Sequence, residues 1–170
     1  MRLGILRHAD AVRVGGLVRD DPDRPLSPLG RDQARRAGNL MHSSGLRFDY
    51  LFTSPLMRAV QTAELIATAL SYGGPVEALP LLGRHDAWRT ELDGLLGEVA
   101  DGNGKAAVLL VGHNPDLSEI AAAVLGLTPA AVQLDTACGC IVDLSAPRIT
   151  SVGTLIGFVD PAATELRRHP

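Results

Sequence analysis

Short apolar runs of β-forming residues alternate along the chain with longer segments in which apolar residues recur at helical spacing. This alternation is typical of an α/β domain, because each parallel strand needs a crossover segment before the next. We expect strands at residues 3–6, 50–53, 76–79, 106–111, 140–144 and 154–159. The pattern predicts a three-layer α/β fold with an open, mainly parallel sheet and helices on both faces.

Helix start signals follow two segments of the chain. Ser27-Pro28 predicts one start, because an N-cap serine accepts a backbone N–H and proline suits the first helical position. Apolar residues then recur at helical spacing up to Gly45. Ser54-Pro55 predicts a second helix start in the same way.

Two further helices are expected over residues 86–99 and 115–125. Pro147 separates the last two strands, which we expect to form an antiparallel hairpin or edge pair. No internal repeat or long linker divides the chain. We therefore expect a single domain over residues 1–160 and a polar C-terminal tail over residues 161–170.

Composition agrees with one globular domain, since chains of about 100 to 200 residues usually form one compact unit. The net charge of -3 argues against a nucleic-acid binder, but the positive charges are unevenly spread. Residues 1–60 hold ten arginines against six aspartates, whereas the remaining residues are net negative. A gene rich in G and C could favour arginine without a functional reason; a local anion site is the alternative explanation.

The chain carries no signal for a membrane. No apolar run reaches the roughly 18 residues that a spanning helix needs. Arg7, His8 and Asp10 interrupt the first apolar stretch, so a secretory signal is not expected. Cys138 and Cys140 are predicted to be reduced, buried thiols rather than a redox or metal pair, which favours a cytoplasmic location.

Candidate chemistry lies where the strands end. Arg7 and His8 follow the first strand, Arg58 comes shortly after the second and His113 follows the fourth. In open α/β sheets, ligands bind outside the carboxyl ends of the strands. Guanidinium groups bind phosphate oxygens in pairs, and a neutral imidazole is a nucleophile at physiological pH. Together these four side chains predict a site for a tetrahedral dianion and for phosphoryl chemistry.

Each of these residues also has a simpler explanation. His8 alone could be a satisfied core histidine, Arg58 a helix-surface arginine and His113 a local cap. Their joint occurrence at the strand ends of one sheet favours a common site. His42, near a helix end, and His169, in the tail, are predicted to be solvated.

Two predicted helix starts lie at the same edge of the sheet. Ser54-Pro55 follows the second strand and Asn114-Pro115 follows the fourth. The free N–H groups and the dipole at a helix N-terminus favour a bound anion. We therefore expect both helix starts to support the anion site.

Four segments at these positions resemble motifs of the histidine phosphatase superfamily. They read LRHA at 6–9, RPLSPLG at 24–30, TSPLMRAVQTA at 53–63 and VGHNP at 111–115. Their order and spacing match over about residues 2–125, and the short chain is similar to the SixA-type branch, the phosphohistidine phosphatases. The resemblance implies a hydrolase with a phosphoglycerate mutase-like fold.

By this resemblance, His8 is the nucleophile that accepts the phosphoryl group. Arg7, Arg58 and His113 would bind the phosphoryl oxygens and stabilise the charge that develops during transfer. The arginines take the place of a metal ion, so the resemblance implies no metal and no cofactor. Arg24 matches a position near the pocket in SixA-like proteins. A loop arginine bound by Asp20, Asp21 or Asp23 is an equally good explanation of Arg24.

Two features depart from the superfamily's pattern: the residue after His8 and the absence of a carboxylate directly after the third strand. The superfamily's usual Arg-His-Gly triplet ends here in Ala9, a variant that also occurs in the SixA-like branch. The added methyl group removes no catalytic group.

No carboxylate immediately follows the third strand, where larger relatives such as the phosphoglycerate mutases carry a glutamate. His85, Asp86 and Asp10 are possible proton donors, although Asp86 is as easily the N-cap of the next helix. A weak or absent acid suits phosphohistidine, because an imidazole leaving group can be protonated beforehand. Only residues 80–85 separate the third strand from that helix, which leaves no room for a capping insertion over the pocket.

The sequence thus favours a metal-independent phosphatase that forms a phosphohistidine intermediate on His8 and acts on phosphohistidine in a protein partner. One alternative is the same chemistry on a small phosphoester or phosphoanhydride. Another is a non-catalytic module that binds a phosphorylated ligand. A metal site made of His8, Asp10 and His113 is a third, which two nearby arginines would disfavour by repelling the cation. The substrate, the proton donor and the oligomeric state stay open.

Overall fold

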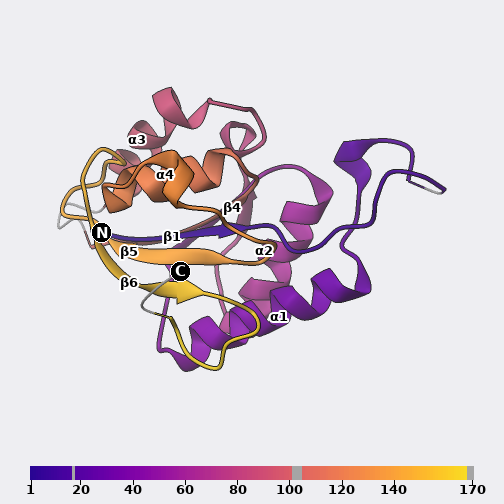
Figure 1. The fold of residues 1–170 in the computed structure, drawn as a ribbon. Coiled ribbons are helices and arrows are strands. Elements are labelled where there is room, and N and C mark those ends of the chain that lie inside the picture. Colours follow the sequence, from indigo (N-terminus) through magenta and orange to yellow (C-terminus); the bar gives the residue numbers. More distant parts are fainter. Residues whose placement is uncertain (17, 101–104, 168–170) are drawn as a thin grey trace.

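The computed structural model describes residues 1–16, 18–100 and 105–167, which form a three-layer α/β fold (Figure 1). Its six-stranded sheet has the order β3-β2-β4-β1-β5-β6. The strands are β1 (Arg2–Arg7), β2 (Tyr50–Thr53), β3 (Val76–Ala78), β4 (Ala107–Gly112), β5 (Gly139–Asp143) and β6 (Thr154–Val159). The first four pair in parallel, while β5 and β6 are antiparallel, which confirms the mainly parallel sheet and the antiparallel edge pair.

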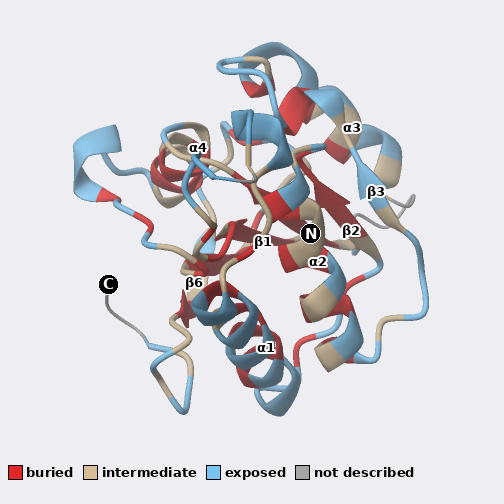
Figure 2. Cartoon of the chain, turned by 90° about the vertical axis from the view of Figure 1, so that its right-hand side faces the viewer, coloured by how far each residue is buried: buried red, intermediate tan, exposed pale blue. Residues whose placement is uncertain are grey.

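Helices cover both faces of the sheet, as the sequence predicts. The helices are α1 (Pro28–Ser43), α2 (Met57–Leu70), α3 (Trp88–Val99) and α4 (Asp116–Leu125), and the short 3-10 segments are η1 (Asp21–Asp23), η2 (Pro80–Leu82) and η3 (Pro129–Ala131). Val108 and Leu110 of β4 pack into the core that contains α3 and α4. Leu109 and Val111 pack into the opposite core, against α1 and α2. Because successive side chains of a strand point to opposite faces, one apolar strand supplies both cores, whose buried residues Figure 2 shows in red.

The predicted start of α1 is confirmed, and the predicted start of α2 is wrong. Ser27 is the N-cap of α1, and its side chain accepts a hydrogen bond from the N–H of Gly30. In contrast, α2 begins at Met57 after the N-cap Leu56. Ser54 instead continues the sheet ladder, because its N–H donates to the carbonyl of β4 residue Val111 at 2.9 Å.

The other two helices also begin later than predicted. Trp88 is the first residue of α3, whose N-cap is Ala87. Asp86, the predicted cap, adopts a left-handed conformation with φ of 60° and lies one residue before that cap. Helix α4 begins at Asp116 rather than at the preceding proline. The predicted helix starts at the strand ends are therefore too early, by two residues for α2 and by one residue for α4.

The C-terminal segment folds back along the edge of the sheet. Phe158 and Arg167 exchange two backbone hydrogen bonds, and the Arg167 guanidinium pairs with Asp160 at 2.9 Å. His42 is exposed in the last turn of α1, as predicted. His169 lies outside the described residues.

Both cysteines are free thiols. Cys140 is buried in β5, and burial raises the pKa of its thiol to about 12. Cys138 precedes the strand and is only half-buried, so the prediction of two buried thiols is wrong for this residue. Burial still raises the pKa of the Cys138 thiol to about 11. Within the described ranges, no helix has the length and apolarity that crossing a membrane requires.

Candidate active site

Three strand ends meet at one edge of the sheet. The N–H of His8, just past β1, donates to the carbonyl of Gly112 in β4 at 2.9 Å. The N–H of Ser54, just past β2, donates to the carbonyl of Val111 at 2.9 Å. These bonds extend the parallel ladder by one residue on each side of β4. As a result, His8, Ser54 and His113 leave the sheet side by side.

An open pocket of about 270 Å³ lies at this edge. Its lining contains every residue that the sequence predicts for the site, together with several polar neighbours. The predicted residues are Arg7, His8, Arg24, Arg58 and His113, and the neighbours include Asp10, Arg13, Asn114 and Thr136. The tertiary fold thus brings all five predicted residues together. The lining is rich in positive charge, which suits an anionic ligand.

His8 is held with one ring nitrogen available for reaction. Its Nδ1 lies 2.7 Å from the carbonyl oxygen of Ala9, which can only accept, so Nδ1 carries the proton. Nε2 therefore carries a lone pair, which accepts a 3.3 Å hydrogen bond from Nε of Arg58. Burial is the main cause that lowers the pKa of His8 to about 4, and the nearby guanidinium of Arg58 lowers it further. The imidazole is therefore neutral at physiological pH.

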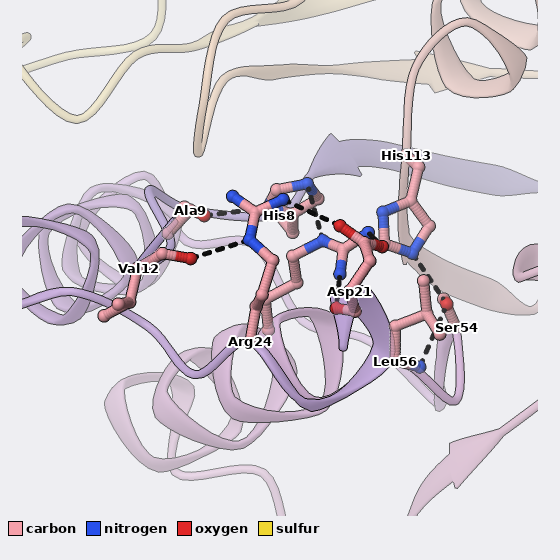
Figure 3. Close-up of polar contacts among 9 residues, drawn as sticks. His8, Ala9, Val12, Asp21, Arg24, Ser54, Leu56 and His113 are labelled. Atoms are coloured by element: carbon pink, nitrogen blue, oxygen red, sulfur yellow. Dashed lines mark hydrogen bonds and ion pairs between the residues drawn. The ribbon is translucent and has the colours of Figure 1, made fainter. Parts of the chain in front are cut away.

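His113 is a second neutral imidazole beside the first. The two ring centroids lie 4.9 Å apart, with the planes at 55°. Its Nε2 is 2.7 Å from Oγ of Ser54, and the same oxygen accepts the N–H of Leu56 at 3.2 Å. Burial lowers the pKa of His113 to about 3, with smaller contributions from His8 and Arg58. Figure 3 draws these contacts.

Arg58 projects into the site from the first turn of α2. Only 7% of the residue is exposed, so the alternative of a helix-surface arginine is wrong. Its Nη1 donates to the main-chain oxygen of Asp21 at 2.9 Å, and its Nη2 donates to Oδ2 of the same residue at 3.0 Å. The third nitrogen, Nε, faces His8.

Two buried nitrogens at the pocket have no hydrogen-bond partner. They are Nε of Arg7 and Nδ1 of His113; in the described part of the chain, Nε1 of Trp88 is the third such side-chain atom. A buried donor without an acceptor destabilises a protein by about 1–3 kcal/mol, so such atoms are uncommon. Both pocket nitrogens belong to residues predicted to bind phosphoryl oxygens. Both side chains line the pocket.

Arg24 fits both explanations that the sequence offers. It lines the pocket, and its Nη1 also binds Oδ1 of Asp21 at 2.9 Å. Its Nε donates to the carbonyl oxygen of Val12 at 2.6 Å. Arg24 is therefore both a pocket residue and a loop arginine held by a neighbouring aspartate.

The three possible proton donors lie in different places. Asp10 lines the pocket, where its Oδ2 accepts a 2.5 Å hydrogen bond from Oγ of Ser27. His85 and Asp86 are exposed beside Asp116 and do not line this pocket. Asp10 is thus the only one of the three that the pocket itself offers.

A candidate metal cluster lies outside the pocket. Among the residues described, one group brings three ligand atoms of His, Cys, Asp or Glu within 4.8 Å of one another, and it consists of His85, Asp86 and Asp116. His8, Asp10 and His113 do not form such a group. The geometry therefore gives no support to the metal site that the sequence left open as an alternative.

Sequence reasoning missed the partners that orient these side chains. The sequence predicts Ser54 to be a helix cap, but its hydroxyl group contacts His113. The sequence suggests Asp21 as a partner of Arg24, but not of Arg58. The carbonyl oxygen of Leu134 accepts Nη1 of Arg7 at 2.9 Å and Nδ2 of Asn114 at 2.8 Å. No sequence signal points to a main-chain carbonyl, whereas the DPDR segment at 21–24 does suggest an aspartate near an arginine.

Known proteins share both the sequence and the fold. The family model of the histidine phosphatase superfamily (branch 1) matches residues 3–86. Phosphohistidine phosphatase SixA of Escherichia coli is 30% identical over 118 residues, which cover 68% of each chain. The chain belongs to the histidine phosphatase superfamily. Within this superfamily it is a SixA-type protein and a phosphatase, as the resemblance predicts.

Further relatives agree with this assignment. An uncharacterised protein of Picosynechococcus is 36% identical over 126 residues, 73% of each chain. The structure of the protein histidine phosphatase SixA complexed with tungstate has a TM-score of 0.77 at 28% identity, covering 95% of this histidine phosphatase and 97% of that chain. The putative SixA of Agrobacterium tumefaciens, at 24% identity and a TM-score of 0.72, shares the fold and covers 94% of this chain and 97% of its own. The phosphoglycerate mutase-like fold is confirmed.

Proposed function

We propose that this histidine phosphatase hydrolyses its substrate through a covalent phosphohistidine on His8, without a metal ion. One observation carries the proposal. The unprotonated Nε2 of His8 faces an open, arginine-lined pocket, together with the side chains of Arg7 and His113, whose Nε and Nδ1 have no hydrogen-bond partner. A phosphoryl group seated against Nε2 would lie among guanidinium and imidazole groups, which bind phosphate oxygens.

In the first step, the Nε2 lone pair of His8 attacks phosphorus while the bond to the leaving group breaks. The leaving group departs with the bonding electrons and takes up a proton. Arg7, Arg58 and His113 bind the three equatorial oxygens and stabilise their charge, which is the dominant contribution in phosphoryl transfer. The carbonyl of Ala9 supports this step, because it holds the Nδ1 proton on the ring as positive charge develops.

In the second step, a water molecule attacks the phosphoryl group on His8. The new oxygen–phosphorus bond forms as the bond to Nε2 breaks, and the electron pair returns to the imidazole. Inorganic phosphate leaves, and the water's proton passes to phosphate or solvent. Splitting hydrolysis in this way replaces one difficult displacement by two easier ones.

Metal independence is part of the proposal. Arg7, Arg24 and Arg58 place three permanent positive charges around the pocket, and these charges can neutralise a phosphoryl dianion. Activity should therefore be unchanged after dialysis against a chelator. Loss of turnover with chelator, and its recovery with a divalent cation, would contradict this part.

We propose phosphohistidine in a protein as the substrate. The relative SixA is named a phosphohistidine phosphatase, and the open pocket suits a side chain presented by a partner. A small phosphoester is the second candidate, because Asp10 lines the pocket and could protonate an alkoxide. A panel of phosphohistidine, aryl phosphate and sugar phosphates decides between them. Fastest hydrolysis of the sugar phosphates would rule out the protein substrate.

The decisive experiment is rapid quench of the wild-type enzyme during turnover. An acid-labile, base-stable phosphoryl group should be trapped on the protein and map to His8. The His8→Ala variant should trap none and lose turnover, whereas the matched variant His42→Ala, at an exposed position of α1, should behave as wild type. Undiminished turnover by His8→Ala would overturn the nucleophile assignment. Phosphate binding without turnover by the wild type would instead favour a non-catalytic binding module.

A cytoplasmic location completes the proposal. Two free cysteines support it, because disulfides form and persist mainly in oxidising compartments. Fractionation of cells that express the native gene would test it. Recovery of the enzyme in an extracellular or periplasmic fraction would be the contrary result.

A further inference from the structure

Asp21 joins two of the pocket arginines from outside the pocket. Its Oδ2 and its main-chain oxygen accept Nη2 and Nη1 of Arg58 at 3.0 and 2.9 Å. Its Oδ1 accepts Nη1 of Arg24 at 2.9 Å. Figure 1 shows that the segment between β1 and α1, which carries Asp21 in η1, extends beyond the sheet at the side of the site. Figure 3 shows the contacts themselves.

These contacts determine which donor of Arg58 faces His8. Asp21 accepts one N–H from each terminal nitrogen of the guanidinium, which orients the group with Nε toward Nε2 of His8 and leaves a second N–H on each terminal nitrogen. An arginine side chain has many rotamers, and its planar fork selects one when two donors are bound at once. The Arg58 side chain is only 8% exposed, so without this partner its charge would be buried and uncompensated.

The carboxylate of Asp21 contacts the guanidinium groups of Arg24 and Arg58, and its charge also acts on His113. Arg24 and Arg58 line the pocket, but Asp21 does not. Its side chain is 54% exposed and faces solvent. One of its two contacts with Arg58 uses the main-chain oxygen, which no rotation of the side chain could release.

Asp21 also lowers the repulsion between two neighbouring cations. Arg24 is itself held by the carbonyl of Val12, so both guanidinium groups are fixed near each other. The hydrogen bond from Arg24, followed by the charge of Arg58, lowers the pKa of the Asp21 carboxyl below its usual range. The ionised carboxylate therefore offsets part of the positive charge before a substrate binds.

We propose that Asp21 is a positioning residue of the phosphoryl site, which sets Arg58 and Arg24 in the geometry that binds the transferred group. The proposal rests on the proposed function, because it assumes that these arginines act on a phosphoryl group. It adds Asp21, a residue outside the pocket lining, to the residues on which phosphoryl transfer depends. Its effect is transmitted through the two guanidinium groups, and Asp21 itself does not touch the substrate.

The test compares Asp21→Ala and Asp21→Asn with the matched variant Asp20→Asn, at an exposed neighbouring position. Turnover of an aryl phosphate and inhibition by inorganic phosphate are measured for each. Asp21→Ala should lower kcat and weaken phosphate binding, with a loss in kcat/KM of about ten- to a hundredfold, the size expected for charge-assisted hydrogen bonds. Asp21→Asn should recover part of this loss, because its amide oxygen still accepts one bond. Asp20→Asn should stay within about twofold of wild type.

A double-variant comparison shows whether Asp21 acts through Arg58. In an Arg58→Lys background, Asp21→Ala should cost less than it does alone, because the bidentate contact is already lost. Thermal unfolding of every variant is measured alongside, so that a folding defect is recognised. If Asp21→Ala is poorly folded, the near-isosteric Asp21→Asn carries the test.

Two results would overturn the proposal. Tighter phosphate binding by Asp21→Ala would make the carboxylate a competitor of the substrate. Wild-type kinetics in both Asp21 variants would mean that the main-chain oxygen alone holds Arg58. Failure of the proposed function is recognised separately, since it would appear as undiminished turnover by His8→Ala.

Discussion

Nε of Arg58 donates a hydrogen bond to Nε2 of His8 over 3.3 Å. This contact requires a lone pair on Nε2, so it exists only while the imidazole is neutral. Protonation of His8 would place an N–H against another N–H and a positive charge beside a guanidinium. Arg58 therefore keeps the proposed nucleophile in its reactive form, and it remains close to the oxygens that it is proposed to bind.

Acid should destabilise the fold through the two site histidines. Burial lowers the pKa of His8 to about 4 and that of His113 to about 3, below the usual value near 6.5. Between the folded pKa values and about pH 6.5, the unfolded chain binds more protons than the folded protein does. The stability contributed by the two histidines is therefore full above about pH 6.5 and falls as the pH decreases towards 4. Each histidine can contribute a slope of up to about 1.4 kcal/mol per pH unit.

Urea unfolding at pH 7 and pH 5 checks this. His113→Gln should lose less stability between the two pH values than wild type, whereas His42→Gln, on the exposed face of α1, should lose as much. Equal losses in all three proteins would contradict the prediction. Because carboxylates contribute equally to each protein, the difference between variants isolates the histidine.

Loss of the Ser54 hydroxyl group should impair the site. Its Oγ contacts Nε2 of His113 at 2.7 Å, so Ser54→Ala leaves that imidazole free to rotate and to change tautomer. We expect kcat to fall by about tenfold, the equivalent of one hydrogen bond of about 1–1.5 kcal/mol, with little change in the melting temperature. Steady-state kinetics would measure it, with Ser43→Ala as the control at an exposed helix end. An unchanged kcat would show that packing alone orients His113.

We expect that lysine cannot take over the function of Arg58. The guanidinium binds Asp21 with two nitrogens and His8 with the third, and a single ammonium group cannot reproduce this arrangement. Arg58→Lys should therefore reduce kcat/KM by about a hundredfold or more, the scale of losing one transition-state donor. Arg36→Lys, in an exposed ion pair with Asp32, is the matched control and should retain wild-type kinetics. Near-normal activity of Arg58→Lys would mean that charge alone suffices.

Gly30 is required by a close backbone approach. A Cβ at this position would overlap the carbonyl oxygen of Asp10, a residue of the pocket lining, and the nearest atoms are all backbone. Gly30→Ala should lower the free energy of unfolding by about 2–4 kcal/mol, the range for overpacked or strained core positions. Gly94→Ala in α3, where a Cβ would meet no atom within 4 Å, should instead stabilise by up to about 1 kcal/mol. Denaturant unfolding compares the two, and a stable Gly30→Ala protein would contradict the expected overlap.

Much of the fold can be predicted from the sequence, because the signals for strand ends and helix starts are local. Every strand lies within one residue of its predicted ends, since each apolar run is short and bounded by polar or turn residues. The start of α1 was equally clear, because Ser27 caps a helix that really begins at the next residue. The same Ser-Pro signal at Ser54 predicts the wrong start for α2, because Ser54 bonds to the sheet and to His113 instead.

The sequence by itself determined the strand order along the chain, the residues at the strand ends and, through them, the predicted pocket of Arg7, His8, Arg58 and His113. Those features follow from periodicity and from the rule that parallel strands share one carboxyl edge. Only the tertiary structure decided which nitrogen of each group is occupied and which is free. The carbonyl of Ala9, the hydroxyl of Ser54 and the oxygens of Asp21 set these choices. Such contacts depend on distances between segments remote in sequence, and main-chain oxygens carry no residue signature by which they could be foreseen.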